Sequence, residues 1–212
     1  MPTESAQQAL AILRQGSQTF QWYVIPLLAF VFYVYTVEAE KRNWPLILAG
    51  LAFWGMDWFN EIWNGLVFHF TNYAPVWGAP GHTAFLILIG LNIEICFMFA
   101  VSGIIWTKML LPDRNAKILG IPNRAFIAVA GAAFCVFVEY VLNSAGVLTW
   151  DYPWWNRGAP WLIFLLGYLT FFIAAFWVFD MKSMKSRLIT VGTIYAVDAI
   201  ALILFIPVLH WI

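Results

Sequence analysis

Charged residues are scarce in this sequence. Only 10% of its 212 residues are Asp, Glu, Lys or Arg, whereas 63% are hydrophobic and 19% are aromatic. Soluble domains carry about 25% charged residues, so this composition excludes an ordinary soluble protein and predicts one polytopic membrane domain. The formal net charge is zero and the basic residues are scattered, which argues against nucleic acid as a partner.

Cysteine and histidine are also rare, with two and three residues. Cys96 and Cys135 both fall in apolar runs, where we expect them to pack as small hydrophobic side chains. Three histidines are too few for the histidine-rich di-iron site of membrane desaturases, and no nucleotide-binding loop or CxxC motif is present. We therefore predict no cofactor and no metal, although a divalent metal near Glu61 and His69 stays an open alternative.

Long apolar runs dominate the rest of the chain. A helix needs about 20 apolar residues to cross a bilayer, and six runs approach or exceed that length. The sequence therefore predicts an all-α membrane protein with about six transmembrane helices, in which 1–19 form an N-terminal lead-in and 20–212 a single transmembrane domain. The predicted spans are 20–37, 45–70, 83–107, 123–145, 159–179 and 188–211.

The basic residues indicate an orientation. Nine of the 11 Lys and Arg residues lie in the first, third and fifth connections between these runs. Since basic loops stay on the cytoplasmic side, loops 71–82 and 146–158 and both termini are expected on the non-cytoplasmic side. We predict a multi-pass protein of the bacterial cytoplasmic membrane or an equivalent membrane, surrounded by lipids, and its oligomeric state stays open.

A short pattern occurs twice, with an offset of 78 residues (139 minus 61). It predicts an internal repeat of two parallel hairpins, about 45–107 and 123–179, with a site between them. The aromatic residues of the two repeat loops fit either an interfacial belt or a pair of lids over a cavity. The matched residues are Phe59, Glu61, Thr71, Pro75 and Trp77, then Phe137, Glu139, Thr149, Pro153 and Trp155, with Gly90 and Gly167 one residue out of step.

Acidic residues inside the predicted spans are the main functional signal. A carboxylate in a bilayer is costly and is typically functional. No Lys or Arg lies deep in any span, so these acids are neutralised by protonation, by a bound cation or by neutral donors. We expect them to meet in one cavity at mid-to-outer depth, and a purely structural hydrogen-bond network is the alternative. The five acids are Asp57, Glu61, Glu94, Glu139 and Asp198.

The segment from Glu61 to Phe68, EIWNGLVF, resembles the helix-two acid motif of the small integral-membrane terpene cyclases of fungal meroterpenoid and indole-diterpene pathways. The run Gly90-Leu91-Asn92-Ile93 is similar to the following helix of that family. This resemblance implies an isoprenoid substrate and a catalytic pair formed by Glu61 and Asp198, although that family has seven spans. Residues 139–153 show a looser similarity to membrane carotenoid cyclases and hydratases.

Together these features predict an enzyme that cyclises, hydrates or isomerises a hydrophobic isoprenoid through a carbocation, as a lyase or isomerase. Glu61 is the expected general acid, Asp198 or Glu139 the base, and Asp57 and Glu94 tune the site. Aromatic faces would stabilise the cation. The alternatives are a proton- or cation-coupled small-solute transporter and a non-catalytic lipid-binding subunit. The predicted substrate contacts are Asn60, Asn64, Asn92, Asn143, Trp58, Trp63, Tyr140 and Trp155.

Overall fold

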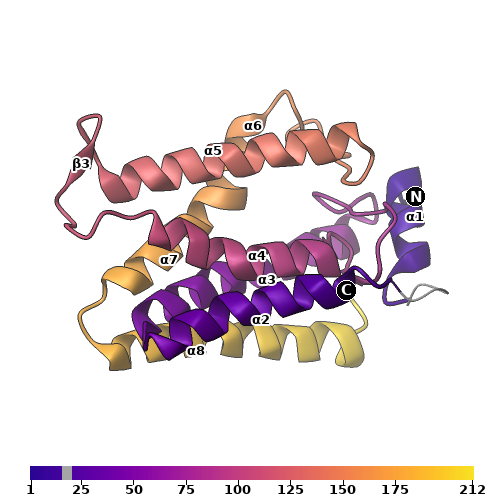
Figure 1. Cartoon of the computed structure of the whole chain (residues 1–212). Coiled ribbons are helices and arrows are strands. Elements are labelled where there is room, and N and C mark those ends of the chain that lie inside the picture. The colour runs from indigo at the N-terminus through magenta and orange to yellow at the C-terminus, as the bar shows by residue number, and fades with distance from the viewer. Residues whose placement is uncertain (16–20) are drawn as a thin grey trace.

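The computed structural model describes residues 1–15 and 21–212 and is mainly α-helical. Most of its long helices run roughly along one direction, whereas α7 (Leu169–Asp180) crosses them obliquely, and the short α1 (Glu4–Ile12) lies across one end of the bundle (Figure 1). The end of the predicted lead-in and the start of the first predicted span lie outside the described residues. The long helices are α2 (Val24–Glu40), α3 (Trp44–Thr71), α4 (Ile93–Lys108), α5 (Asn123–Ser144), α7 (Leu169–Asp180) and α8 (Met184–Ile203).

Each predicted apolar run overlaps one of these helices, so the mostly helical class is confirmed. The short α6 (Pro160–Leu162) and the π-helical η1 (Ile163–Tyr168) continue into α7, and η2 (Leu204–Val208) continues α8. Within the described residues, three helical stretches are long and apolar enough to cross a membrane: Asn123–Ser144, Pro160–Asp180 and Met184–Val208. The total of six spans stays a prediction.

α3 is the central helix. Its residue Phe53 is fully buried and packs edge-on against Phe171 and Phe172 of α7, with ring centroids 5.4 and 5.1 Å apart. Gly50 allows α4 to approach closely, because an added Cβ would lie 2.5 Å from the Ile104 side chain. The N-terminal half of α3 is therefore packed tightly by apolar side chains of α4 and α7.

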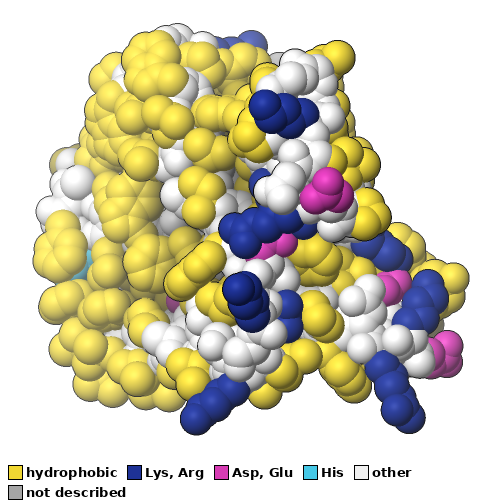
Figure 2. All heavy atoms as spheres, turned by 90° about the vertical axis from the view of Figure 1, so that its left-hand side faces the viewer, with side chains coloured by type: hydrophobic (Ala, Val, Ile, Leu, Met, Phe, Trp, Pro, Cys, Tyr) yellow, Lys and Arg dark blue, Asp and Glu magenta, His cyan; other side chains and the backbone are white. Residues whose placement is uncertain are grey.

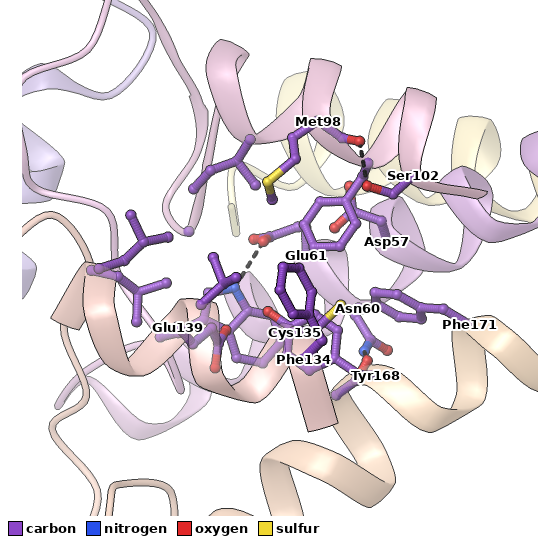
Figure 3. Close-up of a pocket in the computed structure, with 18 of the residues that line it drawn as sticks. Asp57, Asn60, Glu61, Met98, Ser102, Phe134, Cys135, Glu139, Tyr168 and Phe171 are labelled. Carbon is purple, nitrogen blue, oxygen red and sulfur yellow. Dashed lines mark hydrogen bonds between the residues drawn. The ribbon is translucent and has the colours of Figure 1, made fainter. Parts of the chain in front are cut away.

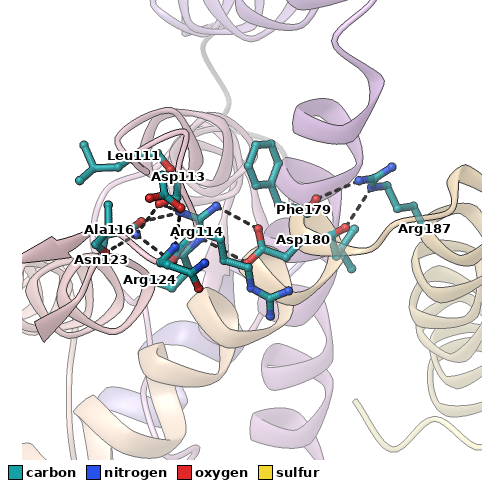
Figure 4. Close-up of polar contacts among 11 residues, drawn as sticks. Leu111, Asp113, Arg114, Ala116, Asn123, Arg124, Phe179, Asp180 and Arg187 are labelled. Carbon is teal, nitrogen blue, oxygen red and sulfur yellow. Dashed lines mark hydrogen bonds and ion pairs between the residues drawn. The ribbon is translucent and has the colours of Figure 1, made fainter.

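The basic connections gather at one end of the bundle (Figure 2). Two short strands, β3 (Lys117–Ile118) and β4 (Ile121–Pro122), form a hairpin there. Arg124 reaches both carboxylate oxygens of Asp180, at 3.2 and 3.0 Å, and Arg114 lies 3.3 Å from the same group (Figure 4). The loops predicted on the opposite side, 71–82 and 146–158, lie at the other end with α1 and both termini (Figure 1).

The start of the predicted third span is wrong. Residues of this run form an antiparallel hairpin of β1 (Leu86–Leu88) and β2 (Leu91–Asn92), and α4 begins only at Ile93. Leu86 and Leu91 are fully buried, so the run is apolar because it packs inside the protein, where non-helical backbone is tolerated. The Asn92 side chain then caps α4 by accepting a hydrogen bond from the Ile95 amide at 2.8 Å.

Candidate functional site

A cavity of about 80 Å³ lies between α4 and α5, with α3 behind it and α7 below (Figure 3). Its rim includes Met98 of α4 and Phe134 of α5, which are 43% and 54% exposed, so the cavity opens sideways between these helices. The lining is mostly apolar and aromatic. It consists of Asp57, Asn60, Glu61, Trp77, Gly90, Ile95, Met98, Phe99, Ser102, Trp106, Phe134, Cys135, Val138, Glu139, Leu142, Leu148, Trp155, Gly167, Tyr168 and Phe171.

Glu61 is the best-positioned acid in this cavity. Its side chain is 3% exposed, and its Oε1 accepts a hydrogen bond of 2.8 Å from the indole N–H of Trp77. Its Oε2 is buried and has no hydrogen-bond partner among the residues that the structure describes. One oxygen is thus held in place while the other is free to act on a ligand.

Glu139 approaches the same cavity from α5. It is 8% exposed, interacts electrostatically with Glu61, and keeps its Oε2 without a hydrogen-bond partner in the described part of the chain. Asp57 also lines the cavity, one helical turn before Glu61. The structure therefore brings three of the five predicted acids together, including both repeat-related glutamates.

Asp198 does not line this cavity. It is 3% exposed on α8, and neither of its carboxylate oxygens has a hydrogen-bond partner among residues 1–15 and 21–212. It interacts electrostatically with Asp57, which in turn interacts with Glu61. Asp198 is thus buried on α8, which packs against α3, and it lies near Asp57 without lining the cavity.

Glu94 lies elsewhere, and its predicted position near the centre of a span is wrong. Because residues 86–92 form a hairpin, Glu94 falls in the first turn of α4. There it accepts hydrogen bonds from the Tyr23 hydroxyl, from Thr83 and, at 2.9 Å, from the Ala84 amide. These contacts tie α4 to α2 and to the loop before the hairpin, and Glu94 does not line the cavity.

The two repeat loops meet at the end of the cavity that lies away from the basic connections. Trp77 and Trp155 stack with ring centroids 5.5 Å apart and an interplanar angle of 27°. Gly78 and Thr149 exchange two backbone hydrogen bonds of 3.0 and 2.8 Å. Trp77 and Trp155 are only 7% and 1% exposed, which fits the lid interpretation for this pair rather than an interfacial belt.

Each repeat glycine lies against the tryptophan of its own half. A Cβ built on Gly90 would fall 2.6 Å from the Trp77 ring, and one on Gly167 would fall 3.5 Å from the Trp155 ring. The halves otherwise differ, because no hairpin among the described residues of the second half corresponds to β1–β2. That the chain arose by duplication stays a prediction.

The predicted asparagines are mostly structural. Asn60 does line the cavity, and its amide donates to the Leu166 and Gly167 carbonyls of η1, both at 3.2 Å. The others lie outside it. Asn64 accepts from the amides of Val76 (2.6 Å) and Trp77 (3.2 Å) and donates to the Trp77 carbonyl at 2.7 Å. Asn92 caps α4, and Asn143 donates to the Leu148 carbonyl at 3.0 Å.

Among the predicted aromatic contacts, Trp155 lines the cavity, whereas Trp58, Trp63 and Tyr140 do not. Sequence reasoning missed several lining residues on α4, α5 and α7. Helical spacing offers a partial signal: Cys135 lies four residues before the acid Glu139, and Phe171 lies four residues after the repeat glycine Gly167. The missed residues include Met98, Phe99, Ser102, Trp106, Phe134, Cys135, Tyr168 and Phe171, whereas Trp77 is one of the repeat-loop aromatics that the sequence predicts over a cavity.

The arrangement of the described side chains includes no group of three or more His, Cys, Asp or Glu residues that could hold a metal ion. His69, considered as a partner for Glu61, instead stacks on Trp211 with ring centroids 5.0 Å apart. What the cavity offers is a set of carboxyl groups that have no cationic partner within the described ranges and that face aromatic rings.

These features define a helical membrane protein with an acid-bearing cavity, and the chain belongs to a family described as an uncharacterized membrane protein family, whose model matches residues 3–207. It is 58% identical over 212 residues to an "Uncharacterized protein" of Archaeoglobus fulgidus, covering all of both chains. A second "Uncharacterized protein" of that organism is 51% identical over 53 residues, 25% of this chain and 95% of the relative. No solved structure matches.

Membership of this family confirms the predicted membrane class. Neither the family description nor these two relatives carries a terpene cyclase name, so they lend no support to that resemblance.

Proposed function

We propose that this protein is an integral-membrane enzyme that acts on a hydrophobic isoprenoid by carboxylic acid–base chemistry. The observation that carries the proposal is that Glu61 and Glu139 face one aromatic-lined cavity, which opens sideways between α4 and α5. With six spanning helices and the basic end in the cytoplasm, this opening faces the hydrocarbon core of the bilayer. A lipid-soluble substrate would then reach the acids without crossing water.

The cavity size limits what enters. About 80 Å³ holds a few water molecules, whereas pockets that enclose a whole drug-sized ligand measure roughly 300–1,000 Å³. A long isoprenoid would therefore place only one end, a terminal double bond or epoxide, beside Glu61. The remaining chain would lie along the lipid-facing groove at Met98 and Phe134.

The proposed reaction begins with proton transfer. The protonated Glu61 carboxyl donates its proton to the terminal alkene carbon or epoxide oxygen, and a carbocation forms as the π bond or C–O bond breaks. An internal double bond can then close a ring by attacking this cation. The Glu139 carboxylate finally removes a proton from an adjacent carbon and a new double bond forms. The faces of Phe99, Trp106 and Phe171 would stabilise the intermediate positive charge.

Turnover assays test this proposal. Purified protein in detergent would be incubated with acyclic isoprenoid alcohols, hydrocarbons and epoxides, and products would be separated by gas chromatography and mass spectrometry. General acid catalysis contributes about 10²- to 10⁴-fold, so Glu61→Gln should reduce the rate by at least ~100-fold. The matched control is Glu40→Gln, an exposed glutamate at the end of α2, which should retain the wild-type rate. Full activity in Glu61→Gln would overturn the proposal.

A proton- or cation-coupled transporter is a second candidate, favoured by the position of Asp198. Its two unpartnered oxygens extend the series of acids from Glu139 through Glu61 and Asp57 to α8. The tight packing of Gly50 against Ile104 closes α3 toward the basic end, so transport requires a second conformation. Solute flux into proteoliposomes that stops in Asp198→Asn, without isoprenoid turnover in the wild type, would favour this candidate. Isoprenoid binding with neither activity would instead indicate a lipid-binding subunit.

A further inference from the structure

A second, larger cavity lies at the outer end of the bundle. It measures about 310 Å³ and is walled by α1, by the last turns of α3, by the β1 region and by the final residues of the chain. We call it the vestibule. Its lining residues are Pro2, Leu10, Leu13, Glu61, Gly65, Phe68, His69, Asn72, Leu88, Ile89, His210, Trp211 and Ile212.

Glu61 lines both the vestibule and the lateral cavity. Its Oε1 is fixed by the Trp77 indole, while its buried Oε2 has no hydrogen-bond partner among the described residues. Asp57 and Glu139 line the lateral cavity but not the vestibule. Glu61 is therefore the one acid of the cavity cluster with a second approach, from the outer end.

The vestibule wall is mostly apolar, but its open end carries polar side chains. His69, Asn72 and His210 bring polar groups to its wall, and Leu10, Asn72 and His210 are exposed at its rim. Its volume has room for several water molecules, and ordered waters persist where polar groups can hold them.

Specific contacts build the vestibule wall. Ser5 at the start of α1 donates a 2.6 Å hydrogen bond to Asp151 of the second repeat loop, and the Arg14 amide donates to the Leu86 carbonyl at 2.9 Å. On the other side, Ile212 packs directly on Gly65, where an added Cβ would lie 2.8 Å from its side chain. α1 thus covers the outer end without filling the space above Glu61.

We propose that the vestibule is an aqueous access route through which Glu61 exchanges its proton with the outer solution. This inference deepens the proposed function, on which it rests for its purpose: through the vestibule Glu61 regains the proton that it spends in the lateral cavity and passes to solvent the proton that Glu139 collects and transfers to it. Water would donate the proton to the free Oε2 of Glu61 and be replenished from outside. The titratable groups facing Glu61 are Asp57 of α3, Glu139 of α5 and Cys96 of α4, with His69 and His210 on the vestibule wall.

Carboxyl labelling tests this route without requiring any turnover. Purified protein in detergent would be treated with a cationic, water-soluble carbodiimide plus an amine nucleophile, or with hydrophobic dicyclohexylcarbodiimide, and modified residues mapped by mass spectrometry. The water-soluble reagent should label Glu61 and spare Glu139 and Asp57. The hydrophobic reagent, which partitions toward the lateral opening, should label Glu61 and Glu139.

A blocking experiment identifies the path. Leu10→Cys places a thiol on the vestibule rim, and Gln8→Cys places one on the exposed part of α1 outside the vestibule. A bulky charged thiol adduct at residue 10 should reduce water-soluble labelling of Glu61 at least fivefold, whereas the adduct at residue 8 should not.

The route is refuted if the water-soluble reagent fails to label Glu61 that the hydrophobic reagent does label, or if both adducts leave its labelling unchanged. Loss of isoprenoid turnover alone would leave these labelling results intact, so failure of the proposed function and failure of the vestibule are distinguishable.

Discussion

Trp77 and Trp155 stack on each other with ring centroids 5.5 Å apart, although each belongs to a different copy of the repeated pattern. The Trp77 indole also donates to Glu61, whereas the Trp155 indole N–H has no partner among the described residues. The two lids are thus unequal at their polar atoms. The Trp77 N–H holds the Glu61 carboxyl in place, whereas the Trp155 N–H, unpaired within the described part of the chain, belongs to a residue that lines the lateral cavity.

The stacked pair should contribute strongly to stability. Trp155→Ala removes a side chain that is 1% exposed, and truncation of a buried aromatic costs about 3–5 kcal/mol. The neighbouring Trp154 is 41% exposed, so Trp154→Ala should cost far less. Thermal unfolding in detergent measures both variants, and equal midpoints would contradict a lid role for Trp155.

The contact between Gly90 and Trp77 should tolerate no added methyl group. Gly90→Ala places a Cβ 2.6 Å from the Trp77 ring and from the Asn64 amide, and overpacking costs about 1–3 kcal/mol. Gly192→Ala is the matched control, because nothing lies within 4 Å of its added Cβ, and alanine in an exposed helix is favoured by about 0.5–1 kcal/mol. Denaturation curves should move in opposite directions.

Asn64 should hold the first repeat loop, residues 71–82, in place over the cavity. Asn64→Ala leaves the Val76 and Trp77 amides without their side-chain acceptor, and each unsatisfied buried group costs about 1–3 kcal/mol. Hydrogen–deuterium exchange should accelerate at these two amides. Asn115→Ala, an exposed asparagine at the basic end, should leave their exchange unchanged. Unaltered protection in Asn64→Ala would show that other contacts hold the loop.

Thiol labelling tests the proposed orientation. In a background with both native cysteines replaced by alanine, Tyr73→Cys lies in the first repeat loop and Asn115→Cys lies at the basic end. A membrane-impermeant reagent added to intact cells should label residue 73 only, and residue 115 only after permeabilisation. The reverse pattern would place the basic end outside and contradict the orientation inferred from Lys and Arg.

The positions of the long helices follow from apolar runs, because a bilayer demands continuous hydrophobic helices. The β1–β2 hairpin could not be predicted in this way, because a buried strand and a buried helix have the same apolar composition. Asn92 and Glu94 did contain a usable signal, namely a capping residue followed by an acid in the first turn. Recognising that signal would have started α4 at Ile93 and moved Glu94 out of the site.

That Glu61 and Glu139 meet in one cavity could be predicted from their matching places in the repeated pattern. That Asp198 lies outside the cavity could not be predicted, because hydropathy does not determine how α8 is rotated about its own axis. For the same reason the sequence did not identify Phe134 and Phe171 as cavity-lining residues, because their positions depend on how α5 and α7 face α4. Side-chain packing, which pattern alone does not encode, decides which residues of a membrane helix face the site.

Transfer of solvent hydrogen to the substrate tests the central claim most directly. When the purified protein converts an isoprenoid alkene in deuterated water, a reaction begun by Glu61 should place one solvent deuterium on the protonated carbon, and Glu61→Gln should abolish this incorporation. If product forms without solvent deuterium at that atom, or if Glu61→Gln incorporates it as fast as the wild type, Glu61 is not the acid.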